Sequence, residues 1–172
     1  MRQQLPVSDY SWCEVTEALV SLFKTFESPH PENWAFDPDR DSHGYVLEVT
    51  LGYPADLHPR HASNPLAPEK RVIRGAELSP YAQTALRATG QSLESYQRTK
   101  LTATFYRREF YVVHFKTLAL YLRLGMKLEA VHRVLKFRQS PWLREYVDRM
   151  TAKRQEAKHE FKRSLMKLLI NR

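Results

Sequence analysis

Hydrophobic and polar positions follow two different periodicities along the chain, one typical of helices and one typical of strands. Apolar residues recur at intervals of three and four in residues 11–27, which predicts an amphipathic helix that stops at the prolines of residues 28–31. Residues 45–51 and 110–115 are rich in β-branched and aromatic side chains and predict strands. Residues 126–137 alternate between apolar and polar positions and predict another strand.

The segments between these elements carry strong turn signals. Residues 116–124 predict a helix that ends at Gly125, because glycine readily takes the left-handed conformation after a helix. Residues 53–80 contain five prolines and are expected to be irregular. Residues 79–97 predict a helix that Gly90 weakens.

The last thirty residues predict helical structure. Ser140 and Pro141 form a helix-start signal, with serine as the cap and proline in the first turn. No glycine or proline follows, so the pattern allows one long helix or a helical pair that turns within residues 153–160. With the strands and helices above, the whole chain is expected to be an α+β fold.

Charge divides the sequence into two unequal halves. Residues 1–95 carry 8 Lys and Arg against 13 Asp and Glu, whereas residues 96–172 carry 19 against 6. The basic half is therefore expected to attract polyanions, with DNA or RNA as the leading candidates. A solubilising surface explains the same surplus without a partner.

Composition excludes several classes of protein. The 172 residues contain no apolar run near the roughly 20 residues that cross a bilayer, so no membrane partner is expected. The N-terminal residues lack the apolar core of a secretory signal, which predicts an intracellular protein of unknown compartment. One cysteine and five scattered glycines exclude a disulfide framework and a phosphate-binding glycine loop.

Two constellations imitate metal sites. Four carboxylates have the spacing of the ligands in a calcium-binding loop, namely Asp37, Asp39, Asp41 and Glu48. Ser42 occupies the position that needs glycine, so we interpret this segment as an acidic surface turn. His58 and His61 share a loop, but the nearest further ligands, His43 and Asp56, have no recognised zinc spacing. We expect polar packing there and no metal site.

The C-terminal helical segment carries its cations in rows. Its expected apolar, packed face consists of Phe161, Leu165, Leu168 and Leu169. One row, spaced by four, is Arg163, Lys167 and Asn171, and a second basic row is Arg154, Lys158 and Lys162. Such rows can hold phosphates at fixed distances, although a solvated helix face gives the same pattern.

Several motifs resemble protein-primed family B DNA polymerases of the Polinton/Maverick transposon and virus type, the viral and organellar group. Residues 53–70 resemble their "YPxxLHxxHxxxPLAPEK" signature, and residues 111–125 resemble "YVVHYRNLxLYLxLG". Similar residues continue from 131 to 143 and then at Tyr146, Asp148, Thr151, Lys153, Arg154, Ala157 and Lys158. These matches follow the family's order and extend over nearly the whole chain.

The resemblance also indicates which parts of such a polymerase are missing. Met1 falls on the last residue of the family's "DxxNLYGxAM" palm motif, with Gln4, Leu5 and Pro6 following as in the family. Residues 167–171 match the start of the fingers motif "KLxxNSxYGK", whose tyrosine and glycine are absent. The catalytic palm aspartates and exonuclease carboxylates have no counterpart, so the chain is expected to be a fragment without catalytic residues.

The resemblance implies a fold of partial palm strands and a terminal-protein region, ending in helical fingers. Residues 1–52 would form a palm-adjacent helix and strand, 53–138 the terminal-protein-contacting region, and 139–172 the fingers. The family implies DNA, deoxynucleoside triphosphates and a terminal primer protein as partners. Nucleotide contacts would come from Arg163, Lys167 and Asn171, and DNA phosphate contacts from Lys153, Arg154, Lys158 and Lys162.

Two functions fit this assignment. The first is a part of a DNA-directed DNA polymerase that contributes nucleotide and DNA binding and is inactive alone, with Mg²⁺ bound only by the complete polymerase. The second is a stand-alone, sequence-independent nucleic-acid-binding protein derived from such a fragment.

Overall fold

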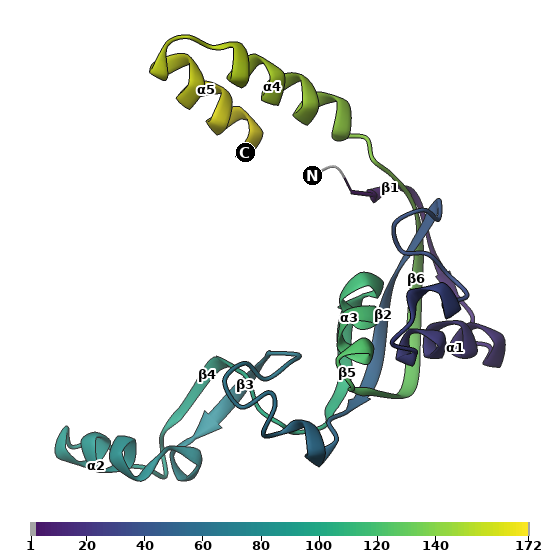
Figure 1. Cartoon of the computed structure of the whole chain (residues 1–172). Coiled ribbons are helices and arrows are strands. Elements are labelled where there is room, and N and C mark those ends of the chain that lie inside the picture. The colour runs from purple at the N-terminus through teal and green to yellow at the C-terminus, as the bar shows by residue number, and fades with distance from the viewer. Residues whose placement is uncertain (1–2, 172) are drawn as a thin grey trace.

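An antiparallel four-stranded sheet forms the centre of the molecule (Figure 1). The structure, a computed structural model, describes residues 3–171 and confirms an α+β fold. The strands follow the order β1-β6-β2-β5, and their bounds are β1 Leu5–Cys13, β2 His43–Gly52, β5 Arg108–His114 and β6 Lys127–Ser140. The predicted strands in residues 45–51, 110–115 and 126–137 are thereby confirmed, with small shifts at their ends.

The main core lies between one face of this sheet and two helices, α1 (Glu17–Lys24) and α3 (Phe115–Arg123). Strand β2 alternates between buried and half-buried side chains over residues 45–49, where Leu47 and Val49 are fully buried while Glu48 between them is not, and its last residues are buried throughout. The two helices and the short helical turn after α1 contribute buried side chains to this core, among them Phe23, Phe26, Phe115, Leu118 and Leu122. Gly125, with φ +106°, ends α3 as predicted.

The predicted helix over residues 11–27 is wrong in its first part. Residues up to Cys13 belong to β1, which pairs with β6 so that Trp12 lies opposite Leu135. Helix α1 begins after Thr16, whose Oγ1 accepts a hydrogen bond from the Leu19 backbone N–H at 3.3 Å. Pairing with a strand more than a hundred residues away outweighs the local helical pattern, because it satisfies the backbone groups of β1.

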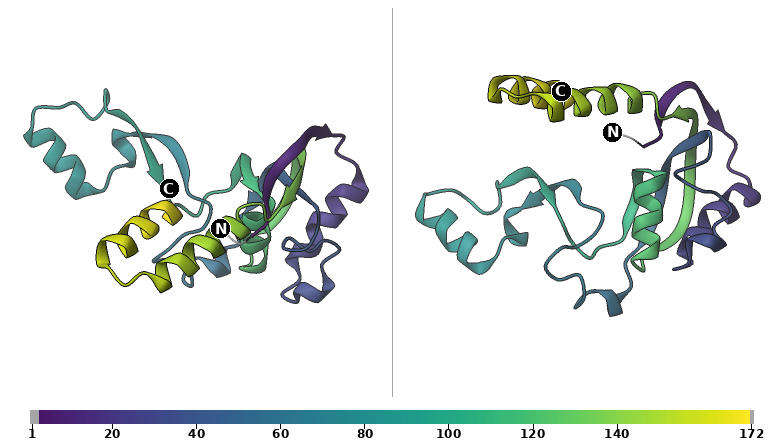
Figure 2. Two further views of the ribbon diagram at one scale, coloured as in Figure 1. Left: turned by 90° about the horizontal axis from the view of Figure 1, so that it is seen from above. Right: turned by 45° about the horizontal axis from the view of Figure 1, so that its top comes forward.

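A two-stranded arm extends from the sheet (Figures 1 and 2). It consists of β3 (Glu69–Arg74), β4 (Gln97–Thr102) and the intervening helix α2 (Pro80–Ala88). The prediction that residues 53–80 are irregular is therefore wrong for β3. The helix predicted in residues 79–97 is confirmed in part, since Ser79 caps α2 and the backbone turns at Gly90 with φ +74°.

A buried arginine joins the arm to the sheet. Arg108, the first residue of β5, is fully buried and donates hydrogen bonds to three backbone oxygens, those of Ala67 at 2.8 Å, Thr104 at 2.7 Å and Tyr106 at 2.6 Å. Its guanidinium also lies 3.2 Å from the Glu69 carboxylate at the start of β3. One side chain thus fixes both strands of the arm at their base.

A helical hairpin forms the C-terminal part of the chain and projects toward the same side as the arm (Figures 1 and 2). Its helices are α4 (Arg144–Glu156) and α5 (Glu160–Asn171), so the predicted turn within residues 153–160 is confirmed and the single long helix is excluded. The predicted start at Ser140 is wrong. Ser140 ends β6 opposite Leu5, and α4 begins four residues later without a side-chain cap.

Candidate nucleic-acid interface

Ion pairs within and around the sheet join the acidic and basic halves of the sequence. Four pairs cross between residues 1–95 and 96–172, namely Glu27–Lys127, Asp39–Lys116, Glu48–Arg133 and Glu69–Arg108, at 2.8–3.2 Å. The hydrogen bond from Arg133 lowers the pKa of Glu48, so this carboxylate stays charged opposite its partner. The charge division along the sequence therefore does not divide the folded molecule into an acidic and a basic half.

Six of the cations without a carboxylate partner among residues 3–171 lie in the helical hairpin. Arg144 and Arg149 form ion pairs one turn along α4, with Asp148 and Glu145. Among residues 3–171, no carboxylate forms an ion pair with the six other cations, Lys153, Arg154, Lys158, Lys162, Arg163 and Lys167. All six are exposed, and they include every cation that the sequence nominates for phosphate binding.

The turn between the helices brings two arginines together. Arg163 Nε donates a hydrogen bond to the Ala157 carbonyl oxygen at 2.8 Å, which satisfies a backbone acceptor at the end of α4. Arg163 and Arg154 then line one shallow depression between the helices, together with Thr151 and Gln155. Two arginines that line one depression, neither paired with a carboxylate among the described residues, give a local positive potential that suits a phosphate.

The two predicted rows behave differently. Arg163 and Lys167 remain one turn apart on α5, on the opposite side of the helix from Phe161 and Leu168. The side chain of Asn171 lies outside the described part of the chain. The second row is wrong as a single helical row, because residues 157–159 break the helix and separate Arg154 on α4 from Lys162 on α5.

The expected packing of the apolar face of α5 is also wrong. Phe161 is 80 % exposed and Leu168 is 64 % exposed, and Leu165 and Leu169 are exposed as well. The turn instead directs another side of α5, with the half-buried Met166 and Ile170, toward α4, where Val147 is buried. Helical periodicity identifies an apolar stripe, but the turn geometry decides which side of the helix is covered.

The arm adds cations that the sequence reading did not nominate. In the register of β3 and β4, Lys70, Arg74, Arg98 and Lys100 are all exposed, and none of them pairs with a carboxylate among the described residues. Lys100 lies over the ring of Tyr96 with its Nζ 6.0 Å from the centroid, and Arg71 lies over Tyr106 at 5.4 Å. The alternation within residues 69–74 was the available signal, and the surrounding prolines obscured it.

The two constellations that imitate metal sites are occupied by hydrogen bonds and packing. In the acidic turn, the Asp37 backbone N–H donates to Asp41, and Asp39 pairs with Lys116 at 2.8 Å. His61 Nδ1 lies 2.8 Å from the Tyr53 hydroxyl, and His58 stacks on Phe105 with ring centroids 4.3 Å apart. In the part of the chain that the structure describes, no three or more metal-ligating side chains come together.

Comparisons with known proteins give no relative from which a function could be inferred. No family model, curated protein or solved structure matches this chain. None of the helices within residues 3–171 combines the length and hydrophobicity needed to span a bilayer. The geometry of the basic hairpin therefore carries the functional argument.

Proposed function

We propose that this chain binds the phosphate backbone of DNA through its helical hairpin, as the nucleotide- and DNA-contacting part of a protein-primed DNA polymerase. The observation that carries the proposal is the set of six exposed hairpin cations without carboxylate partners. Cations that are already neutralised release few counterions on DNA, whereas free ones provide the main driving force for binding to phosphates.

The distribution of these cations favours a polyanion over a single small anion. They extend from Lys153 on α4, over the turn, to Lys167 on α5, and the two helices of this hairpin fold back on each other. Contacts between cations and the phosphate backbone carry no sequence information, so binding through these cations is expected to be independent of base sequence. The arm, on the same side of the sheet, offers further unpaired cations.

The nucleotide part of the proposal concerns one side of α5. Arg163 and Lys167 would contact the phosphates of an incoming deoxynucleoside triphosphate, with Asn171 beside its base or sugar. Supporting this, the two cations share one side of the helix, and the hairpin matches the antiparallel pair that the resemblance implies for the fingers. Catalysis would require Mg²⁺ held by aspartates, for which this chain offers no matching carboxylates, so we expect the chain to act in binding alone.

The test is the salt dependence of DNA binding by the whole chain. Fluorescence anisotropy of labelled duplexes of two unrelated sequences should give equal affinities at each salt concentration. If about five phosphates are engaged, log K should fall against log salt with a slope near −4 to −5. An affinity that does not change with salt, or that differs strongly between the two sequences, would refute phosphate-backbone binding.

A further inference from the structure

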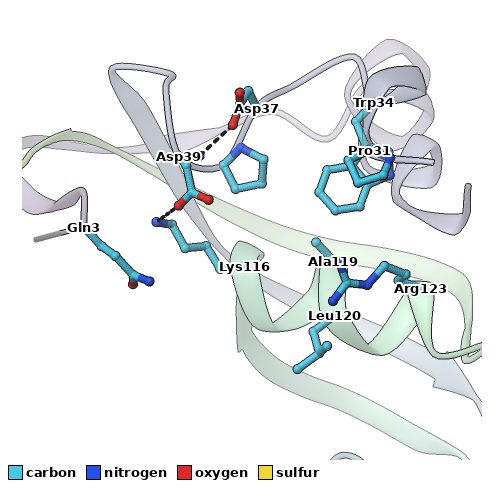
Figure 3. Close-up of a pocket in the computed structure, with 10 residues that line it drawn as sticks. Gln3, Pro31, Trp34, Asp37, Asp39, Lys116, Ala119, Leu120 and Arg123 are labelled. Carbon is cyan, nitrogen blue, oxygen red and sulfur yellow. Dashed lines mark hydrogen bonds and ion pairs between the residues drawn. The ribbon is translucent and has the colours of Figure 1, made fainter. Parts of the chain in front are cut away.

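A cleft of about 420 Å³ lies between the loop of residues 30–41 and helix α3 (Figure 3). Its apolar walls are Pro31, Trp34 and Pro38 on the loop and Ala119 and Leu120 on the helix. None of its lining residues belongs to the helical hairpin. The volume is within the range of sites that hold small organic ligands.

The aromatic wall of the cleft is fixed in place. Trp34 donates a hydrogen bond from Nε1 to the Ser28 carbonyl oxygen at 3.1 Å, and its ring packs edge-on against the buried Phe26 with centroids 5.0 Å apart. The flanking prolines restrict the loop backbone further. A ligand would therefore meet a preformed apolar surface and lose little affinity to ordering it.

Acidic residues close one end of the cleft. Asp39 is bound to Lys116 at 2.8 Å, and the Asp37 carboxylate accepts a hydrogen bond from the Asp39 backbone N–H at 2.9 Å (Figure 3). The acidic turn that imitates a calcium loop thus serves as a wall. Asp37 also lies 3.4 Å from Arg40, so the charges at this end are already paired and attract an anion less than a free guanidinium does.

A free guanidinium lies at the other end. Arg123 is exposed, and within residues 3–171 it forms no ion pair with a carboxylate. Figure 3 draws its side chain between Trp34 and Leu120. Because Lys116 and Arg123 are seven residues apart on α3, the two ends of the cleft are separated by roughly 10 Å. That length accommodates one ring system with one charged substituent.

We propose that this cleft binds a small planar ring compound that carries one anionic group. The ring lies against Trp34, and a carboxylate or phosphate receives paired hydrogen bonds from Arg123. Arg123 sets the orientation, because the charges of Asp37 and Asp39 at the other end are already paired with Arg40 and Lys116. This site is independent of phosphate-backbone binding by the hairpin.

Tryptophan fluorescence offers a direct test. The chain has three tryptophans, and Trp12 and Trp142 are both exposed, so the double variant Trp12→Phe/Trp142→Phe leaves Trp34 as the sole reporter. We would titrate 4-nitrobenzoate, 4-nitrophenyl phosphate and the uncharged 4-nitrobenzamide. Saturable quenching by the anions is expected, with the amide binding at least ~tenfold more weakly. The tighter of the two anions identifies carboxylate or phosphate as the natural group.

A matched pair of arginine variants locates the anion. Arg123 also lines a neighbouring cleft that contains Arg60, so the two sites must be separated. Arg123→Met should lower the affinity for the anions ~tenfold, to that of the amide, while Arg60→Met should leave it unchanged. The proposal is overturned by absence of saturable quenching, by equal binding of the amide, or by loss of binding in Arg60→Met alone.

Discussion

The central sheet and the helical hairpin use charge in opposite ways. Around the sheet, Lys116, Lys127 and Arg133 each lie within 3.2 Å of a carboxylate that comes from the other half of the sequence. In the hairpin, by contrast, six cations have no carboxylate partner among the described residues. Three cations around the sheet are thus neutralised by pairs that stabilise the fold, whereas the six hairpin cations stay available for an external anion.

The two regions also differ in how they use apolar residues. The sheet and its helices bury a large aromatic and aliphatic core that includes Leu47, Phe23 and Phe115. The hairpin buries little, and the most apolar side of α5 is exposed. The hairpin is therefore stabilised by fewer buried apolar side chains than the sheet and its helices.

The largest effect is expected at the arginine that joins the arm to the sheet. Arg108→Met leaves three backbone oxygens and the Glu69 carboxylate without their buried cation, which should cost about 3–5 kcal/mol of unfolding free energy. Arg107→Met is the matched control, because Arg107 is exposed and pairs with Glu109 and Glu129 in solvent. Urea denaturation compares the two, and equal losses would show that Arg108 is not an anchor.

A leucine pair tests the difference in packing between the regions. Leu47→Ala in the fully buried centre of β2 should cost about 2–5 kcal/mol, through lost burial and the cavity left behind. Leu168→Ala on α5 should change stability by less than about 0.5 kcal/mol, because that side chain is mostly exposed. Thermal and urea unfolding measure both, and a large loss at Leu168 would mean that the apolar side of α5 is covered in solution.

A lysine pair on α5 sharpens the proposal within the hairpin. In a reconstituted polymerase that carries this segment, Lys167→Ala should weaken nucleotide binding by about 1.5–3 kcal/mol, since a charged phosphate contact is lost. Lys162→Ala should cost much less, because an exposed lysine away from the phosphates contributes little. The measurement is the apparent nucleotide affinity of the two variants. Small and equal effects would mean that Arg163 and Lys167 lie on a solvated helix face that does not bind nucleotide.

The smallest effect concerns the pH dependence of the sheet. Burial, and then the charge of Lys116, lower the pKa of His114, which caps α3 by accepting a hydrogen bond from the Lys116 backbone N–H. The neutral imidazole is favoured in the folded state, so its contribution is present above the ordinary histidine pKa of about 6.5 and is lost as the pH falls. His114→Asn keeps an acceptor and should flatten this part of the acid profile, whereas the exposed His159→Asn should not. The measurement is the unfolding free energy of each variant from pH 7.5 to 5. If His114→Asn has the same pH dependence as the original chain, His114 plays no part.

Local patterns predict the elements whose determinants are close in sequence. Strand β2 and helix α3 with its Gly125 end follow from periodicity and turn residues, whereas the turn between α4 and α5 is one of two alternatives that the local pattern allows. Strand β1 and the arm do not, since β1 pairs with β6 across most of the chain and β3 pairs with β4 across an intervening helix. Long-range pairing of this kind leaves only a weak local signal.

The candidate site was predictable in its residue types more than in its arrangement. Lys and Arg density nominates the hairpin, and all six nominated cations are exposed. Their pairing state depends on where distant carboxylates lie in the fold, so sequence alone could not separate Lys158 from Lys116. Arg154 and Arg163 line the same depression because of the turn at residues 157–159, and local sequence rules do not determine the geometry of that turn.

The salt slope of DNA binding in two triple variants tests the central difference most directly. The hairpin variant replaces Lys153, Lys158 and Lys162 with Gln, and the sheet variant replaces Lys116, Lys127 and Arg133 with Gln, so each removes three positive charges. We expect the hairpin variant to lower the magnitude of the slope by about 2–3 and the sheet variant to keep the original slope. Equal changes in the two variants, or a larger change in the sheet variant, would contradict this expectation.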